Sequence, residues 1–469
     1  MQDMINQLWN TPQTQKMLKS MGVPMGEKLS REKKMWSGFP FADEYFVVFS
    51  QNNAEQIAEC IFSGGGNIYL KDDVAQKIIF QESAKHYARK LESDVINDGQ
   101  KIKGVVFDAS GFTKVSELET LYSTIHNLLT KLQRNAKIVV IAKSLAAANS
   151  YEEASISTAI KGFIKSLSKE VGNKGITANL LYIEKNSVFK NALSFFLSDS
   201  SVYVTGQQTL VEEVNKKDRV DCFTPQILSG KTALVTGASR GIGEKICDAL
   251  TREGAKVIAL DRVQEASNLE KVCLRNQATP LYADLNEADS ATKISQWLQE
   301  NTSGLDIVVH NAGITRDKTL KKMSQESWKD TLRINLEAVI ELNTKLEKDI
   351  LKQKSKIVCL SSIAGLAGNF GQTNYAASKA GLVGYIEYFT KNAKRKDIQI
   401  NAVAPGFIET SMTEKIPFVT KEVARRFSSL MQGGLPEDVA ELVAFLASPH
   451  SNGTNGQVIR VCGGNLIGA

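Results

Sequence analysis

The chain has 469 residues, of which 42% are hydrophobic and 23% charged, and its formal net charge is +6. This length exceeds what one core usually serves and predicts two or three domains, while the composition is that of an ordinary globular protein. The mild, dispersed charge argues against nucleic acid as a partner. No apolar run reaches the ~18 residues of a membrane span, and the opening "MQDMINQLWNTPQTQ" lacks the pattern of a secretory signal.

The cysteines and histidines indicate neither a disulfide framework nor a metal site. Six cysteines are scattered without a C-x-x-C pair, which is typical of reduced thiols in the cytoplasm. The four histidines lack the spacing of metal ligands. We therefore expect a cytoplasmic protein that holds no metal.

In chain order, the sequence predicts an N-terminal arm, a first α/β domain, a linker and a second α/β domain. The arm, residues 1–45, contains a short amphipathic helix and a turn around Pro24. Residues 46–212 alternate helical stretches with the apolar strands "EYFVVFS", "KGVVFDASG", "AKIVVIAKS" and "GITANLLYI". Charges and Pro225 mark residues 213–229 as the linker.

Residues 230–469 repeat the alternation in a more complete form. "KTALV" precedes a glycine-rich turn, an amphipathic helix and the strand "AKVIALD", which together make a β-α-β unit. The later strands are "LDIVVHNAG", "SKIVCLSS" and "IQINAVAPG". Strands that alternate with helices predict a parallel, doubly wound sheet. The predicted fold class is α/β with two doubly wound, Rossmann-like parallel-sheet domains, the first degenerate and either Rossmann-like or flavodoxin-like.

The two domains read as copies of one fold, although any two α/β domains share part of this pattern. "SYEEASISTAIKGFIKSL" in the first domain aligns with "TNYAASKAGLVGYIEYF" in the second. The later helix carries Tyr375 and Lys379 where the earlier one carries Glu153 and Ser157. The chemistry of the two copies should therefore differ.

The glycine-rich turn "TGASRGIG" predicts a nucleotide site. Gly237, Gly241 and Gly243 follow a strand and begin a helix, where small residues let the backbone approach a pyrophosphate. Asp261 ends the next strand, from which a carboxylate can bond to a ribose hydroxyl.

A second constellation predicts proton transfer. Tyr375 and Lys379 are four residues apart and project from one face of a helix. Ser362 ends a strand, where a parallel sheet presents ligand-binding groups. Because a neighbouring ammonium favours the phenolate, the pair predicts a tyrosine that exchanges a proton near neutral pH.

With these residues in place, the second domain resembles the short-chain dehydrogenase/reductases from residue 230 to 464. The motifs that carry the resemblance are T-G-x3-G-x-G at Thr236, Gly237, Gly241 and Gly243, N-A-G at Asn311, Ala312 and Gly313, the active-site asparagine at Asn335, and P-G-x3-T at Pro405, Gly406 and Thr410. One departure is His310, where the family usually has asparagine, and we expect a local adjustment there.

Within the family, "GASRGIG", "NYAASKAGLVG" and "NAVAPGFIETSMT" are most similar to the 3-oxoacyl-[acyl-carrier-protein] reductases. The arm and the degenerate first domain are similar to the high-molecular-weight form of that reductase. The resemblance implies NAD(P)H-dependent reduction of 3-oxoacyl thioesters, on acyl carrier protein or CoA, to 3-hydroxyacyl thioesters. The alternative is a dehydrogenase of 3-hydroxyacyl-CoA or of another secondary alcohol. A nucleotide-binding scaffold is a weaker alternative, because a scaffold needs no Ser-Tyr-Lys set.

The resemblance also implies a role for each site residue. Tyr375 would protonate the substrate oxygen, Ser362 would hold it, Lys379 would lower the tyrosine pKa and bind the nicotinamide ribose, and Asn335 would anchor a relay water. The implied cofactor-binding residues are Gly237, Ser239, Arg240, Gly241, Ile242, Gly243, Asp261, Arg262, Asp284, Leu285, Asn311, Ala312, Gly313, Tyr375, Lys379, Pro405, Gly406, Ile408 and Thr410.

Two residues oppose each other in the choice of cofactor. Arg240 can favour the 2′-phosphate of NADPH, whereas Asp261 would repel it and bond to an unphosphorylated ribose. A strand-end aspartate is held in place while an arginine can swing away, so we expect a preference for NADH. Arg262 leaves some use of NADPH possible.

The first domain lacks the glycine turn and, at the serine position, carries Lys143. We expect it to be inert and to act as a packing partner, with a retained pocket for an acyl chain or an effector as the alternative. Since related reductases form tetramers, two fused chains would supply four modules, and we expect a homodimer. The basic segments around Arg395 and Arg425 are read either as contacts for a phosphate or an acidic carrier, or as ordinary solvated helix faces.

Overall fold

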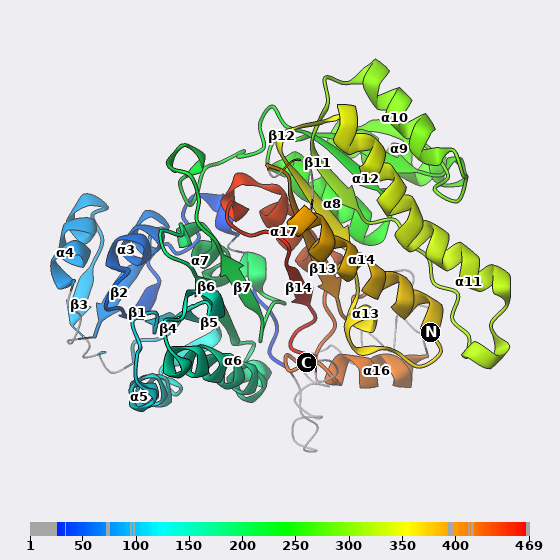
Figure 1. The fold of residues 1–469 in the computed structure, drawn as a ribbon. Helices are drawn as coiled ribbons and strands as arrows, with labels where there is room; N and C mark the ends of the chain where they lie inside the picture. The colour runs from blue at the N-terminus through cyan, green and yellow to red at the C-terminus, as the bar shows by residue number, and fades with distance from the viewer. Residues whose placement is uncertain are drawn as a thin grey trace.

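The fold was analysed in a computed structural model, which describes residues 26–32, 34–71, 76–93, 96, 99–392, 395, 397–410, 413 and 417–465. The helix predicted in the arm lies outside the described residues. The chain forms two seven-stranded sheets in which every strand pairing is parallel, and helices cover both sheets (Figure 1). This confirms the predicted fold class. The domain boundaries stay a prediction.

The first sheet has the strand order β3-β2-β1-β4-β5-β6-β7. A strand order that begins 3-2-1-4-5 is that of Rossmann folds, whereas flavodoxin-like sheets have the order 2-1-3-4-5. Its strands are β1 (Tyr45–Phe49), β2 (Asn67–Leu70), β3 (Leu91–Ser93), β4 (Ile102–Asp108), β5 (Leu132–Lys143), β6 (Thr177–Ile183) and β7 (Gln208–Val211). Its helices are α3 (Ala54–Ser63), α4 (Lys77–His86), α5 (Leu118–Leu128), α6 (Tyr151–Val171) and α7 (Lys190–Leu197).

The second sheet repeats this order as β10-β9-β8-β11-β12-β13-β14. Its strands are β8 (Thr232–Thr236), β9 (Lys256–Asp261), β10 (Thr279–Tyr282), β11 (Leu305–His310), β12 (Leu351–Leu360), β13 (Gln399–Pro405) and β14 (Val458–Val461). Its helices are α8 (Gly241–Arg252), α9 (Ala266–Asn276), α10 (Ser290–Asn301), α11 (Gln325–Leu332), α12 (Ala338–Asp349), α13 (Ile363–Ala367), α14 (Thr373–Asn392), α16 (Phe418–Arg426) and α17 (Pro436–Ala447).

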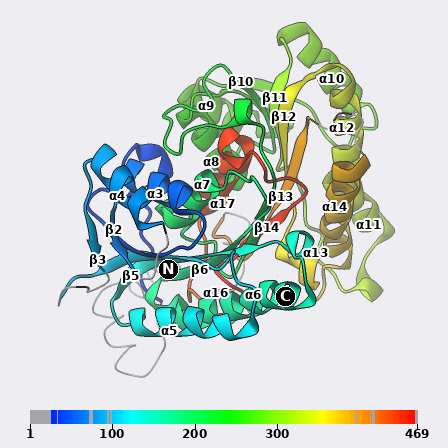
Figure 2. The ribbon, with the colours of Figure 1, turned by 60° about the vertical axis from the view of Figure 1, so that its left-hand side comes forward.

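The outer face of each sheet has its own core, and the inner faces share one. In the first half α5 and α6 pack on one face of the sheet, and in the second half α10, α12 and α14 do so (Figure 2). A third cluster of buried side chains runs from α3 and α7 of the first half into α8 and α17 of the second. Because one apolar core crosses the junction, the two halves are packed as one body.

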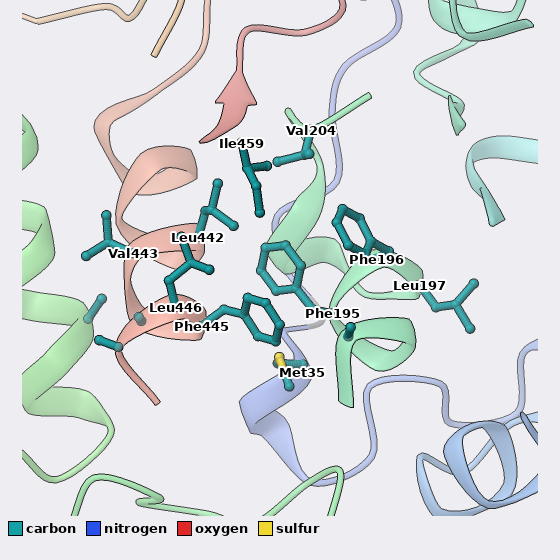
Figure 3. Close-up of a cluster of buried hydrophobic side chains, with 14 of the residues drawn as sticks. Met35, Phe195, Phe196, Leu197, Val204, Leu442, Val443, Phe445, Leu446 and Ile459 are labelled. Carbon is teal, nitrogen blue, oxygen red and sulfur yellow. The ribbon is translucent and has the colours of Figure 1, made fainter. Parts of the chain in front are cut away.

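Part of this shared core lies between α7 and α17 (Figure 3). Phe195 of α7 stacks on Phe445 of α17, with 4.5 Å between ring centroids, and both side chains are fully buried. Two large aromatic side chains removed from water stabilise the contact by about 3–5 kcal/mol each, judged by the usual cost of replacing them with alanine.

The edge strands β7 and β14 are joined by side chains in a reciprocal way. Gln457 accepts a hydrogen bond from Leu210 N (2.8 Å) and donates one to Leu210 O (2.6 Å). Gln207 in turn accepts a hydrogen bond from Arg460 N (3.2 Å). The two glutamines hold equivalent places in "TGQQT" and "NGQVI", so the halves meet across an approximate two-fold axis, as subunits of a symmetric dimer do.

Two buried carboxylates on α17 are paired with cationic and polar groups from other segments. Asp438 accepts hydrogen bonds from both Nε and Nη2 of Arg31 in the N-terminal arm, at 2.8 and 2.9 Å. Glu441 receives Trp36 Nε1 (2.9 Å) and Arg252 Nη1 (2.8 Å). Since a buried carboxylate without a partner is strongly destabilising, these contacts bind residues before β1 to the second half.

Two buried histidines sit at structural junctions of the second half. His310 ends β11 and its Nε2 lies 2.7 Å from Asn343 Oδ1. His450 follows α17, with Nε2 3.0 Å from the carbonyl of Asp221. Among the described residues, no helix is long and apolar enough to cross a membrane.

The lowered pKa values of these two histidines predict a loss of stability at acidic pH. Burial lowers the pKa of His310 and of His450 to about 4, whereas a histidine in the unfolded chain has a pKa of about 6.5. As the pH falls from about 6.5 to about 4, the unfolded chain binds these protons first. The free energy of unfolding should therefore decrease in this window, by at most about 1.4 kcal/mol per pH unit for each histidine.

Urea titrations at a series of pH values measure this slope. His310→Asn should remove the contribution of one histidine and so reduce the slope of the free energy of unfolding against pH. His86→Asn, which replaces an exposed imidazole, is the control for the substitution itself. An equal slope in wild type and His310→Asn would contradict the prediction.

Candidate functional site

The predicted site residues converge at the carboxyl ends of β8, β11, β12 and β13, the edge at which parallel sheets bind ligands. After β8 the chain turns at Gly237 (φ +66°) and Gly241 (φ +60°), a backbone conformation that favours glycine. A Cβ at Gly243 would lie 2.0 Å from the carbonyl oxygen of Gly237. The turn therefore requires glycine, and it brings the amino end of α8 to the sheet edge.

Asn311 and Thr236 hold the turn against β11. Asn311 Nδ2 donates to the carbonyl oxygens of Thr236 (3.0 Å) and Gly237 (2.9 Å). Thr236 Oγ1 accepts from the backbone amides of Asn311 and Ala312, both at 3.1 Å. Hydrogen bonds from Asn311 and Ala312 thus fix the glycine turn to the end of β11.

At the end of β9, Asp261 is fixed by the backbone. Its two oxygens accept from Ser239 N (3.1 Å) and Arg262 N (2.9 Å). Arg240 and Arg262 both reach toward Glu265, at 3.4 and 3.8 Å. The carboxylate is therefore held beside the turn, and Glu265 partly compensates the charges of the two guanidinium groups.

Two further residues that the resemblance implies for cofactor binding, Asp284 and Leu285, follow β10. Asp284 accepts from Asn286 N at 2.9 Å, and Leu285 is buried. Both lie in the loop from β10 to α10, beside the β9 end that carries Asp261.

Ser362, Tyr375 and Lys379 are brought together as predicted. The Ser362 hydroxyl is a hydrogen-bond partner of the Tyr375 phenol. Lys379 Nζ lies 5.7 Å from the centre of the Tyr375 ring and donates to the carbonyl of Leu360 at 2.7 Å. Ser362 also caps α13 by accepting from Ala364 N (3.2 Å), which fixes its side chain.

The protonation of this group differs from the sequence-based expectation. Burial raises the pKa of the Tyr375 phenol, and the hydrogen bond from Ser362 acts in the opposite direction. The expected lowering by Lys379 is wrong for this geometry, because the lysine amine turns to a main-chain carbonyl and burial lowers its own pKa to about 8. Tyr375 is therefore a neutral phenol at pH 7, which is the form that can donate a proton.

Asn335 lies in a π-helical turn, Arg333–Glu337, between α11 and α12. Its Oδ1 accepts from Ile314 N (2.8 Å), and its Nδ2 donates to Ile314 O and to Ser378 Oγ at 3.0 and 3.1 Å. A Cβ at Gly313 would lie 3.2 Å from Asn335 Oδ1 and 3.3 Å from Lys379 Nζ. The π-helical turn that carries Asn335 is a type of irregularity that occurs frequently at functional sites.

The segment from Pro405 to Thr410 closes the site from the β13 side. Gly406 packs on Cys462, where a Cβ would approach the cysteine Cβ to 2.7 Å, and Ile408 is buried. A Cβ at Gly241 would lie 3.9 Å from Thr410 Cγ2. The end of this segment therefore lies beside the glycine turn.

His310, which stands where the family usually has asparagine, is buried at the end of β11. Burial lowers its pKa to about 4, so the imidazole is neutral and shares a hydrogen bond with Asn343. The neighbouring Asn311 keeps its contacts with the glycine turn.

At the corresponding strand ends of the first half, polar side chains bond to one another. Ser50 and Asp108 occupy the strand-end places of Thr236 and His310, by the register of β1 with β4 and of β8 with β11. The buried Asp108 carboxylate accepts from Ser50 Oγ (3.1 Å), Asn53 Nδ2 (2.9 Å) and Ser110 Oγ (2.6 Å). A buried negative charge at this point would repel a pyrophosphate.

The catalytic positions of the first half are joined by an ion pair. Lys143, at the serine position, lies 2.8 Å from Glu153, at the tyrosine position. Ser157, at the lysine position, donates to the Lys143 carbonyl at 2.9 Å. The tyrosine position therefore carries no phenol, and the ammonium of Lys143 is paired with Glu153. That this half is inert stays a prediction.

Sequence reasoning missed two supporting residues and overvalued one basic segment. Ser378 and Glu265 contact predicted site residues, and only Glu265 had a visible signal, its place three residues after Arg262. Arg425 binds Glu409 at 2.7 Å and also pairs with Glu422, so the reading as an anion contact is not supported there. Of the other segment, Lys394 and Lys396 lie outside the described residues.

Comparison with known proteins agrees with this geometry. Residues 237–465 match the family described as Enoyl-(Acyl carrier protein) reductase. The 3-oxoacyl-[acyl-carrier-protein] reductase of Thermotoga maritima is 39% identical over 246 residues, and those of Rickettsia prowazekii and Vibrio cholerae are 40% and 35% identical over 242 and 238 residues. The matches take 51%, 51% and 50% of this chain and 99%, 98% and 98% of the relatives. The chain therefore belongs to the short-chain dehydrogenase/reductase family, through a second half that aligns with relatives named as 3-oxoacyl-[acyl-carrier-protein] reductases.

Proposed function

We propose that this chain reduces 3-oxoacyl thioesters to 3-hydroxyacyl thioesters with a nicotinamide dinucleotide. The observation that carries the proposal is the convergence of Ser362, Tyr375 and Lys379 beside a glycine turn that a pyrophosphate can approach. The relatives' names add the acyl-carrier-protein thioester as the favoured substrate. In this proposal a CoA thioester is a second substrate. The proposed location is the cytoplasm.

The residues present fit a dinucleotide. The glycine turn leaves room for phosphates at the amino end of α8, and Gly313 packs closely against Asn335 and Lys379. The proposed binding set consists of Gly237, Ser239, Arg240, Gly241, Ile242, Gly243, Asp261, Arg262, Asp284, Leu285, Asn311, Ala312, Gly313, Tyr375, Lys379, Pro405, Gly406, Ile408 and Thr410.

In the proposed reaction the reduced nicotinamide supplies a hydride to the β-carbonyl carbon. Tyr375, held neutral by burial, gives its proton to the carbonyl oxygen as negative charge develops there. Ser362 donates a hydrogen bond to the same oxygen. Lys379 and Asn335, which both lie close to Gly313, return a proton to the tyrosine by way of water.

Replacing the proton donor tests the proposal. Tyr375→Phe should lower the rate of 3-oxoacyl thioester reduction by about 10²–10⁴-fold, the usual contribution of general acid catalysis, and leave NADH affinity nearly unchanged. The assay follows NADH oxidation with acetoacetyl thioesters of CoA and of acyl carrier protein.

Glu153→Ala, at the equivalent position of the first half, is the matched control and should keep wild-type rates. A Tyr375→Phe enzyme with more than about a tenth of the wild-type rate would contradict the acid role. Turnover of a 2-enoyl thioester but not of any 3-oxoacyl thioester would overturn the proposed substrate.

The proposed cofactor preference is for NADH. Because two backbone amides fix the Asp261 carboxylate beside the turn, a ribose 2′-hydroxyl finds an acceptor there and a 2′-phosphate meets a like charge. The charges of Arg240 and Arg262 are partly compensated by Glu265, which limits their attraction for a phosphate.

Asp261→Ala should shift the ratio of kcat/KM for NADH over NADPH toward NADPH by about tenfold or more, the factor that about 1.4 kcal/mol represents. Asp284→Ala, a second acidic residue near the adenine side, is the control and should leave the ratio close to wild type. A wild-type preference for NADPH, or an unchanged ratio in Asp261→Ala, would show that this carboxylate does not set the choice.

The proposed assembly is a homodimer formed through the outer helices. Gly384 lies in the middle of α14 with open space at its Cβ position, and Gly162 lies likewise in α6. An exposed glycine inside a helix costs about 1 kcal/mol relative to alanine, which a closely packed partner helix would offset. Ile340 and Tyr388 on α12 and α14 are exposed apolar residues of the same surface.

Light scattering should give the mass of two chains for the wild type. Ile340→Arg combined with Tyr388→Asp should give single chains, because charges in an apolar contact oppose association. Leu274→Asp, at an exposed leucine on α9, should leave the dimer intact. A wild-type mass of one or of four chains would overturn the arrangement.

A further inference from the structure

Tyr203 of the first half reaches into the second half behind the predicted site. It lies between α7 and β7 and is 1% exposed. Its hydroxyl donates to the carbonyl of Gln432 at 2.7 Å, and its own carbonyl accepts from Gly463 N at 3.0 Å. Burial raises the pKa of the phenol, so the hydroxyl stays a donor.

The ring of Tyr203 occupies a slot made by two glycines. A Cβ at Gly434 would lie 2.5 Å from one edge of the ring, and a Cβ at Gly463 would lie 2.7 Å from the other. Gly434 and Gly463 belong to the second half, one before α17 and one after β14. A tyrosine from one half therefore fits between backbone segments of the other.

The slot is connected to the segment that closes the site. Gly434 N donates to Phe407 O (3.0 Å), and Glu409 N donates to Gly434 O (2.8 Å). These bonds form a short bridge between residues 407–409 and the backbone on which Tyr203 rests. Thr410, the next residue, lies beside the glycine turn at Gly241.

The second half has no counterpart of the Tyr203 side chain at the equivalent position. Aligning "SDSSVYVTGQ" with "SPHSNGTNGQ" puts Gly453 of the second half where the first half has Tyr203. Gly453 has φ +88°, and a Cβ there would lie 2.8 Å from the carbonyl oxygen of Glu212. The second half thus sends no matching side chain back to the filled site of the first.

We infer that Tyr203 is a positioning residue: from the inert half, it holds the 405–410 segment in the geometry that binds the nicotinamide dinucleotide. The first half would then contribute to ligand binding as well as to packing. The inference rests on the proposed function only where acyl turnover is measured, because dinucleotide binding can be measured alone.

Tyr203→Phe in the full-length chain tests the inference, because it removes the hydroxyl and keeps the ring. The dissociation constant for NADH, from tryptophan fluorescence, and the KM for NADH should both rise by about two- to tenfold, the range of a net hydrogen bond, with kcat changed less than twofold. Hydrogen exchange should become faster at Glu409 and Gly434. Tyr203→Leu, which also removes the ring, should enlarge both effects.

Tyr182→Phe is the matched control. The Tyr182 hydroxyl donates to Ser157 O at 2.9 Å within the first half, so its loss should leave NADH affinity and exchange at residues 405–434 as in wild type. Equal behaviour of Tyr203→Phe and Tyr182→Phe would overturn the inference. Failure of every protein, wild type included, to reduce an acyl thioester would overturn the proposed function, while NADH affinity and exchange would still decide the role of Tyr203.

Discussion

The burial of one apolar surface on each sheet is the constraint on which the rest of this structure depends. The inner face of each half carries large apolar side chains, among them Phe195 and Phe445. Exposure of so large an apolar surface to water would be unfavourable. Each half covers the other, and a single core results. The buried Asp438 and Glu441 on α17 then require partners, which Arg31, Trp36 and Arg252 provide.

The same constraint explains why the two halves diverged in chemistry but not in architecture. Strand order and the reciprocal glutamine contacts are common to both, because the junction needs two matching surfaces. The ligand edge of the first sheet carries no such demand. There Asp108 bonds to Ser50, Asn53 and Ser110, and Lys143 pairs with Glu153, so these polar groups have partners within the first half.

Burial also determines the electrostatics of the intact site. It raises the pKa of Tyr375 and lowers that of Lys379 to about 8, because loss of solvation disfavours the phenolate and the ammonium. A neutral phenol beside a partly protonated amine suits donation of a proton to a substrate oxygen. The first half contributes to the geometry from a distance, since Tyr203 contacts the backbone that connects to residues 407–409.

The sequence by itself determined the fold class, the repeat and the composition of the site. Apolar strands at regular spacing, the glycine turn and the Ser-Tyr-Lys set are local patterns, and local patterns are what periodicity and motif spacing report. The short strands β2, β3 and β10 escaped this reading, because three or four residues carry too little periodicity. Only the tertiary structure decided the rest: that Lys379 turns to Leu360 O, that Glu265 compensates two arginines, and that Tyr203 supports the other half. These features arise from contacts between residues far apart in the chain, and a linear pattern does not contain such distances.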